Sequence, residues 1–330
     1  MTVRLIHASV DPSLKAVLVA RSPLRYAAGP DRTLDRPGHV RSGSALASFA
    51  GRIAVIQDDA HFVALVDRAG GHAEAIVLEP GAGGRRVFDA ARGNKALKLD
   101  LEACIVCEGV LIAFGSGSTT KRERCVVVRQ QNGGFKSRIV DAGALYRALR
   151  ERPAFSGSEL NLEGAACRAD GRVVLFQRGN GAPRDGLLPV DATCELVLAE
   201  LLAFLERGCA GPAPQISNVT EYQLGSIDGV RLTFTDAATF ERTLLFLAAA
   251  EASPDTVGDG PVHGIALGQI DERGRARWAP IVDSRGRPVT SKLEGLLVDP
   301  ETPGRAFAVS DADDPDAPSE LCELELTGIA

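Results

Sequence analysis

Short apolar runs separated by tight turns recur along this chain. Between Ser42 and Leu78 the sequence holds four such runs, at residues 44–49, 52–57, 62–67 and 73–78. The turns between them contain glycine and aspartate, which supply the positive φ angles or the side-chain-to-backbone bonds that hairpins need. Runs of this length and composition indicate β-strands. The pattern predicts a small antiparallel sheet of four strands.

A two-strand phrase, with a polar residue near the start of its first strand, occurs five times. Leu293-Glu294-Gly295 followed by residues 305–309 is its clearest copy, and Leu162-Glu163-Gly164 followed by residues 173–178 is a close relative. The polar anchors of the five copies are Ser44, Glu102, Glu163, Asp236 and Glu294, and they are spaced by roughly 60 residues, up to about 73. One supersecondary unit repeated at this period is typical of a radial array. We therefore predict an all-β propeller in a single domain, residues 1–330, with five blades, or six if residues 11–41 form their own.

Two helices and a ring closure complete the predicted architecture. Residues 142–152 place Leu145, Tyr146 and Leu149 on one helical face, with Asp141 as the cap, and a second short helix is expected over residues 200–207. The last unit lacks a fourth strand, and its exposed edge needs a cover. Thr2–His7 is the candidate for that strand, so the two ends of the chain would close one blade together.

Composition excludes several classes of function. The net charge of −6 and the aromatic share of 5% argue against a nucleic-acid partner, which requires a basic surface. No apolar run is long enough to span a membrane, and the first residues show no signal-peptide pattern. The seven cysteines are scattered, and Cys104 and Cys107, in C-x-x-C spacing, have no second ligand pair. We expect core thiols in a cytoplasmic protein.

In a propeller the first strand of each blade lines the central channel. Strand alternation then places each anchor and the residue two before it in the channel. The predicted lining is Ser42, Ser44, Asp100, Glu102, Asn161, Glu163, Phe234, Asp236, Lys292 and Glu294. Four carboxylates around one axis repel each other unless something compensates their charge. The alternatives are a Ca²⁺ or Mg²⁺ ion held by Glu102, Glu163, Asp236 and Glu294, a lysine such as Lys98 or Lys292, shared protons, or bonds to backbone N–H groups of the next blade.

A second group of polar residues follows the second strands and is expected at one mouth of the channel. The candidate ligand-binding residues there and on the channel wall are Asp58, Ser116, Arg178, Asp311 and Lys292. Arg178 is the only cation at that rim, and arginine suits a carboxylate or phosphate. Zinc hydrolysis is excluded because no histidine pair has metal-binding spacing. His263, Glu163 and Glu294 are candidates for acid–base catalysis.

The phrases around Glu163 and Glu294, together with 234–238 and 310–314, resemble the blades of an uncharacterised bacterial propeller family related to esterase-like and phytase-like proteins. The general plan is also similar to SdiA-regulated proteins and, more remotely, to gluconolactonase and paraoxonase propellers. The lactonase resemblance implies a divalent ion, such as calcium, held by acids at the axis. Those sites mix asparagine ligands with the acids, whereas here only Asn161 offers one.

Two functions remain open at this point. The first is a metal-dependent hydrolase of a small ester, lactone or phosphoester, with the ion polarising the carbonyl. The second is a propeller that binds a small ligand at the channel mouth, or serves as a scaffold, without catalysis.

Overall fold

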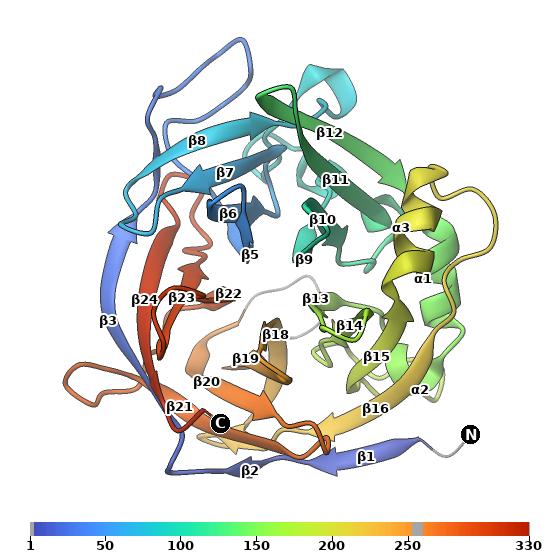
Figure 1. Ribbon diagram of the computed structural model, residues 1–330, viewed down its shortest axis with the longest axis vertical. Helices are drawn as coiled ribbons and strands as arrows, with labels where there is room; N and C mark the ends of the chain where they lie inside the picture. The colour runs from blue at the N-terminus through green and yellow to red at the C-terminus, as the bar shows by residue number, and fades with distance from the viewer. Residues whose placement is uncertain (1–2, 253–259, 330) are drawn as a thin grey trace.

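The protein has a propeller-like, mostly β fold in which twisted sheets surround a common axis (Figure 1). The structure, a computed structural model, describes residues 3–252 and 260–329. Within these residues, five inner strands stand around the axis, each in contact with the next, and the last contacts the first. They are β5 (Gly43–Phe49), β9 (Leu101–Cys107), β13 (Leu162–Cys167), β18 (Val230–Phe240) and β22 (Leu293–Val298).

From each inner strand the chain runs outward in antiparallel strands. The second strands are β6 (Arg52–Gln57), β10 (Val110–Gly115), β14 (Arg172–Gln177), β19 (Thr243–Glu251) and β23 (Arg305–Ser310). The third strands are β7 (Phe62–Val66), β11 (Arg124–Gln131), β15 (Asp191–Val197), β20 (Val262–Ile270) and β24 (Glu320–Thr327). The outer strands are β8 (His72–Val77), β12 (Gly134–Asp141), β16 (Ser217–Gln223), β21 (Ala276–Asp283) and β3 (Lys15–Pro23). Glu108 and Gly109, between β9 and β10, both have positive φ angles, as a tight two-residue hairpin requires.

The hydrophobic core lies between neighbouring sheets. Five clusters of buried apolar side chains each join one sheet to the next around the ring. Phe234 of β18 lies at the centre of one cluster, with its ring 5.1 Å from both Phe176 and Phe246. The prediction that Phe234 lines the channel is therefore wrong, because its side chain faces the neighbouring sheet.

The N-terminal segment closes the ring, but with a different strand from the one predicted. β3 pairs antiparallel with β24, and its Ala16 and Leu18 are buried. The predicted strand, which begins at Thr2 outside the described residues, appears as β1 (Arg4–His7) and pairs in parallel with β16. β1 carries too little buried surface to complete a core, whereas β3 supplies apolar side chains to it. β2 (Ser9–Val10) pairs with β21, and β4 (Arg25–Tyr26) pairs with β8, so residues 11–41 form no separate sheet.

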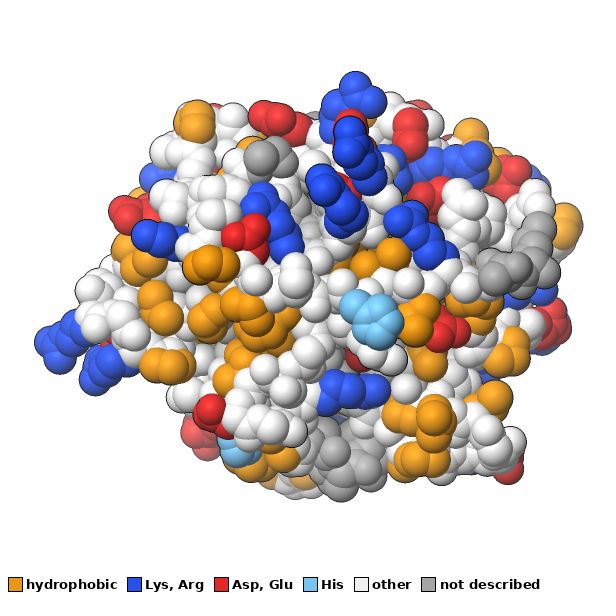
Figure 2. Space-filling model, turned by 90° about the horizontal axis from the view of Figure 1, so that it is seen from below, with side chains coloured by type: hydrophobic (Ala, Val, Ile, Leu, Met, Phe, Trp, Pro, Cys, Tyr) orange, Lys and Arg blue, Asp and Glu red, His pale blue; other side chains and the backbone are white. Residues whose placement is uncertain are grey.

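The outermost strands leave apolar side chains in solvent. On the side of the molecule that faces down in Figure 1, hydrophobic side chains lie among charged ones (Figure 2). Leu5 of β1 and Val10 of β2 are 46% and 60% exposed. The short β17 (Ser226–Ile227) pairs with β18 at the edge of its sheet. No helix in the described part of the chain is long and apolar enough to cross a membrane.

Both predicted helices are present. They are α1 (Gly143–Arg150) and α3 (Leu198–Glu206), and a further turn forms α2 (Pro153–Ser156). Leu145, Tyr146 and Leu149 are buried as predicted, and Tyr146 donates a hydrogen bond to the Gly115 carbonyl at 2.7 Å. Asp141 accepts from the Gly143 N–H at 3.0 Å, which satisfies one of the free donors at the start of α1. Three short 3₁₀ turns are η1 (Ala82–Gly84), η2 (Lys95–Leu97) and η3 (Thr120–Arg122).

A disulfide joins Cys107 of β9 to Cys167 of β13. The expectation that all seven cysteines are free core thiols is wrong for this pair. Cys104, Cys125, Cys194, Cys209 and Cys322 are free and buried, as expected. The sequence could not reveal the pair, because the two residues lie 60 positions apart and meet only where two inner strands become neighbours.

Candidate functional site

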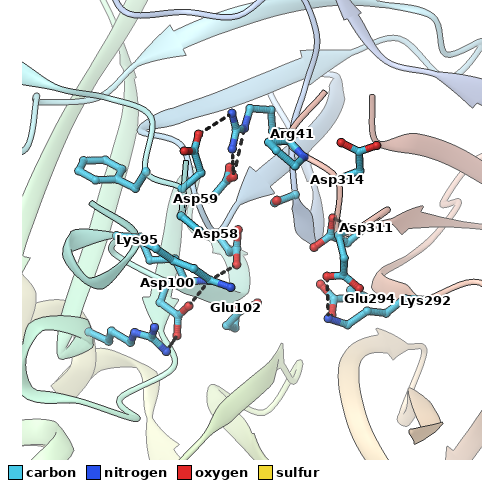
Figure 3. A pocket seen from close by; sticks show the side chains of 18 of the residues that line it. Arg41, Asp58, Asp59, Lys95, Asp100, Glu102, Lys292, Glu294, Asp311 and Asp314 are labelled. Carbon is cyan, nitrogen blue, oxygen red and sulfur yellow. Dashed lines mark hydrogen bonds and ion pairs between the residues drawn. The ribbon is translucent and has the colours of Figure 1, made fainter. Parts of the chain in front are cut away.

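A cavity of about 390 Å³ opens at one end of the ring, where the inner strands begin and the second strands end. Its walls come from the first residues of β9, β13 and β22, from the loops after the second strands, and from the connector 80–99. Figure 3 shows its side chains, with one group around Asp58 and Asp100 facing a second group around Glu294 and Asp311. A volume of this size suits a small organic molecule.

The lining of the cavity is strongly acidic. Among the described residues, eleven carboxylate side chains and six cationic side chains line it. The cations are Arg41, Lys95, Lys98, Arg122, Arg178 and Lys292. The formal excess is five negative charges, so charge compensation governs what this site can bind.

A bulge near the start of each inner strand directs one side chain out of the regular alternation. The pairing with the second strand skips Ser44 in β5, Glu102 in β9 and Glu163 in β13. It skips Thr235 in β18, and Glu294 with Gly295 in β22. A bulge adds a residue to one strand and re-aims its side chain. The repeated position is therefore occupied by Thr235 in the fourth unit and not by Asp236.

Hydrogen bonds to the next inner strand support this alignment. The Ser44 hydroxyl donates to the Leu101 carbonyl at 2.5 Å, and the Thr235 hydroxyl donates to the Leu293 carbonyl at 3.3 Å. Leu101 and Leu293 each precede a repeated glutamate, so the two hydroxyls make equivalent contacts. Two of the five repeated positions fasten neighbouring strands, and the other three present glutamates to the cavity.

Asp236 does not line the cavity, which corrects its predicted place in the channel. It is 1% exposed, and its Oδ2 accepts the backbone N–H of Leu296 at 2.6 Å. A slip of one residue along a strand turns a side chain to the opposite face. Asp236 therefore joins β18 to β22, which is the backbone-bonding alternative that the sequence left open.

Lys98 is the cation at the centre of one acidic group. Its ammonium bonds Asp58 and, at 2.6 Å, Oδ1 of Asp100. Arg122 contacts the other oxygen of Asp100 at 2.8 Å, and the Ser116 hydroxyl donates to that oxygen as well. Burial acts to raise the pKa of Asp100, but Lys98 and Arg122 outweigh it, and the pKa lies below its usual value. Ser116 thus orients Asp100 and is not itself part of the lining.

Arg41 forms a second ion-paired group at the rim. Its Nη2 lies 2.5 Å from Oδ2 of Asp59, and its Nη1 lies 3.3 Å from Asp89. Burial and the neighbouring Asp58 raise the pKa of Asp59 to about 6. Asp89 belongs to the connector 80–99, so this pair fastens the connector to the start of the first repeated unit.

Arg178 forms ion pairs with two acids. Its Nη2 lies 2.6 Å from Glu251, and its Nη1 lies 3.5 Å from Oε2 of Glu163. Asn161 donates to Oε1 of Glu163 at 2.6 Å. Burial raises the pKa of Glu163 to about 7 even though Arg178 and Lys292 lower it. The predicted role of Arg178 as an anion receptor therefore gains no support from its contacts.

Glu294 and Asp311 lie on the opposite side of the cavity. Lys292 approaches Oε1 of Glu294 at 3.2 Å and Asp313 at 3.6 Å. Burial raises the pKa of Glu294 to about 7, with Lys292 acting against it and Glu163 with it. Burial and Glu294 raise the pKa of Asp311 well above its usual range.

Glu102 has no hydrogen bond or ion pair with any described residue. Burial raises its pKa well above the usual range, and Asp100, Asp58, Glu163 and Glu294 add to the effect. The three repeated glutamates therefore line one cavity and influence one another electrostatically. His263, the other predicted base, lies at the second position of β20 and does not line the cavity.

Several lining residues escaped the sequence analysis. Arg41, Asp89 and Arg122 do not occupy a repeated position in the sequence. Only the folding of the chain brings their side chains to the cavity. The connector 80–99 did carry a signal, since a loop of this length without strand pattern is frequently functional. It supplies Phe88, Asp89, Lys95 and Lys98 to the cavity wall.

The predicted set of four metal ligands is not assembled as expected. Asp236 accepts a hydrogen bond from a backbone N–H. Glu163 faces Arg178, and Glu294 faces Lys292. A different set of oxygens, from Asp58, Asp100 and Glu102, lies within 4.8 Å of one another. However, the Lys98 ammonium already bonds two of these three acids, so this arrangement fits an internal cation better than a bare metal ion.

No protein with a curated description matches this sequence. Among solved structures, glutaminyl cyclase from Myxococcus xanthus aligns with 96% of this chain and 98% of its own, at 12% identity and a TM-score of 0.46. The PQQ-bound aldose sugar dehydrogenase from Streptomyces coelicolor aligns with 96% of this chain and 100% of its own, at 11% identity and a TM-score of 0.44. Likenesses at this level do not extend to activity or ligands.

The family described as "Family of unknown function (DUF6929)" matches residues 39–326. This range contains all five inner strands and both groups of acids at the cavity. The chain belongs to this family.

Proposed function

We propose that this protein is a single-domain, five-bladed propeller that hydrolyses a small ester or lactone in the axial cavity. The observation that carries the proposal is the pair Glu163 and Glu294. They are 6% and 5% exposed, they line one open cavity, and each has a pKa of about 7. Carboxyl groups with a pKa near the working pH are suited to general acid–base catalysis.

The contacts of the two glutamates support different proposed roles. Glu163 receives a hydrogen bond from Asn161 and faces Arg178, and both contacts favour its charged form. Among the described residues, the ammonium of Lys292 is the ion-pair partner of Glu294, which accepts no hydrogen bond from a side-chain amide and is proposed as the proton donor. In the proposed reaction, Glu163 accepts a proton from water as that water attacks the carbonyl carbon. Glu294 then donates its proton to the leaving oxygen as the ester C–O bond breaks.

A divalent ion remains a proposal, now at Asp58, Asp100 and Glu102 in place of the four ligands expected from the sequence. An ion there would have to displace the Lys98 ammonium, so we expect weak binding. The proposed proton transfers require no metal. A chelator distinguishes the two versions, because loss of activity would place Ca²⁺ or Mg²⁺ in the reaction.

The test is a panel of esters, lactones and phosphoesters assayed with the purified protein. We expect turnover of uncharged or cationic esters or lactones, and about 10²- to 10⁴-fold losses in kcat for Glu163→Gln and for Glu294→Gln. Glu325→Gln, an exposed acid on β24, is the matched control and should retain full activity. The pH profile should be bell-shaped around neutrality, because one glutamate must be charged and the other protonated.

Inactivity across the panel would remove the hydrolase and leave the second candidate, a propeller that binds a ligand without turnover. The excess of acids over cations at the cavity favours that candidate independently of any chemistry. Retained activity in Glu163→Gln would contradict the assignment of the base.

A further inference from the structure

The hydrogen-bond donors at the cavity are largely used within the protein. Lys98 bonds Asp58 and Asp100, Arg178 bonds Glu251 and faces Glu163, and Arg41 bonds Asp59 and Asp89. A phosphate or carboxylate ligand that bound one of these three buried cations would have to separate its pair. Breaking a buried ion pair leaves a charge without compensation and is strongly unfavourable.

Lys95 is an exposed cation of the lining, whereas the buried lining groups that remain open to a ligand among the described residues are acceptors. Glu294 is 5% exposed, and only its Oε1 has an ion-pair partner among the described residues. Asn161 is 3% exposed, and its amide nitrogen donates to Glu163 and to Asn180, which leaves its carbonyl oxygen as an acceptor. Glu102 has neither oxygen paired among those residues. A ligand that supplies donors and positive charge would complete this set.

The size of the cavity favours a small molecule over a single metal ion as its ligand. A volume of about 390 Å³ holds a ligand of several heavy atoms, far more than a single metal ion. An ammonium group has three donors and one positive charge, which match the open acceptors and the excess of acids.

We propose that the ligand of this cavity carries a protonated amine, and that Glu102 and Asn161 accept hydrogen bonds from its ammonium group, with Asp311 on the facing wall. This inference deepens the proposed function, since it names the substrate class as amine-bearing esters or lactones. It also stands without catalysis, because it concerns binding alone.

The first experiment measures binding by calorimetry and by thermal unfolding at neutral pH. Putrescine is the probe, and 1,4-butanediol is its uncharged counterpart of the same length. We expect putrescine to bind saturably and to raise Tm, and butanediol to do neither. Glu102→Gln should weaken the binding of putrescine at least about tenfold, whereas Glu325→Gln should leave the binding unchanged.

Folding is controlled within the same set of variants. Glu102 has no partner to lose, so Glu102→Gln should unfold at the same or a higher temperature than the parent protein. Asp311→Asn is the second variant, and it should also weaken the binding of putrescine. Equal binding of putrescine and butanediol, or binding unchanged in both variants, would overturn the proposal. So would saturable binding of Ca²⁺ or Mg²⁺ alone with no binding of putrescine.

The second experiment compares an amino-acid ester with its N-acetylated counterpart as substrates. We expect a higher kcat/KM for the free amine. Putrescine binding without any hydrolysis would support the ammonium site and contradict the hydrolase. Hydrolysis without preference for the amine would support the hydrolase and contradict the ammonium site.

Discussion

The carboxylates of this axis differ because each meets different neighbours. Asp236 accepts a hydrogen bond from a backbone N–H, and Glu163 accepts one from Asn161 and faces Arg178. Glu102 has no hydrogen bond or ion pair with any described residue, and burial and neighbouring acids raise its pKa. A buried carboxylate loses hydration, and only a cation or a donor restores the stability of its charged form. Residue type alone therefore does not set the protonation state at this site.

The raised pKa values of Glu163 and Glu294 predict how stability changes with pH. The unfolded chain releases these protons near pH 4.5, whereas the folded protein holds them until about pH 7. The folded state binds more protons in this interval, so the free energy of unfolding should fall as the pH rises from about 4.5 to 7. We expect a loss of roughly 1–3 kcal/mol per group.

Urea unfolding at pH 5 and pH 8 measures this effect. In the double variant Glu163→Gln with Glu294→Gln the difference between the two pH values should shrink. Acids whose pKa is lowered, such as Asp100, titrate below this interval and do not interfere. A pH dependence unchanged by the double substitution would show that the two carboxyl groups titrate normally.

At the scale of elements, the bulge near the start of each inner strand determines which side chains form the site. The bulge re-aims one side chain in each strand, so that Glu102, Glu163 and Glu294 face the cavity while Ser44 and Thr235 bond the next strand. Asp236 adds a further link from β18 to β22 through Leu296. The same strands therefore hold the ring together and present its acids.

Substitution of Asp236 tests this structural role. Asp236→Ala leaves the Leu296 N–H buried without an acceptor and should destabilise the protein by about 1–3 kcal/mol. Asp236→Asn keeps an acceptor oxygen and should cost much less. Denaturant unfolding of both variants provides the measurement. Equal stability of the two would mean that this hydrogen bond does not fasten the strands.

At the scale of the whole molecule, closure of the ring depends on β3. It covers the edge of β24, and its Ala16 and Leu18, with Leu14 just before the strand, are buried in the core. β1 and β2 add two- to four-residue parallel pairings on the outside. The N-terminal segment thus contains one strand essential for the core and two that are peripheral.

Two truncations separate these contributions. Removal of residues 1–10 should lower Tm by only a few degrees and leave a monodisperse protein. Removal of residues 1–23 should expose the edge of β24 and cause unfolding or aggregation. Thermal unfolding and light scattering test both variants, and a stable, soluble protein lacking residues 1–23 would contradict the role assigned to β3.

Much of the architecture could be predicted because strands, turns and helices are local. The alternation in residues 44–78, the repeat of Glu102, Glu163 and Glu294, and the buried face of α1 are all legible in the sequence. The bulge in β18 was not, because Thr235 and Asp236 are both polar and only the pairing with β19 tells them apart. That single-residue uncertainty placed Asp236 in the channel.

The sequence by itself determined the β-rich repeat and the accumulation of acids at its anchors, since both follow from local pattern. The tertiary structure decided which of those acids meet and which cations compensate them. Lys98 reaches Asp58, Arg41 reaches Asp59, and Arg178 reaches Glu163 and Glu251 over separations of 15 to 73 residues. Contacts over such separations arise only when the ring closes, so the chemistry of the cavity is a property of the fold.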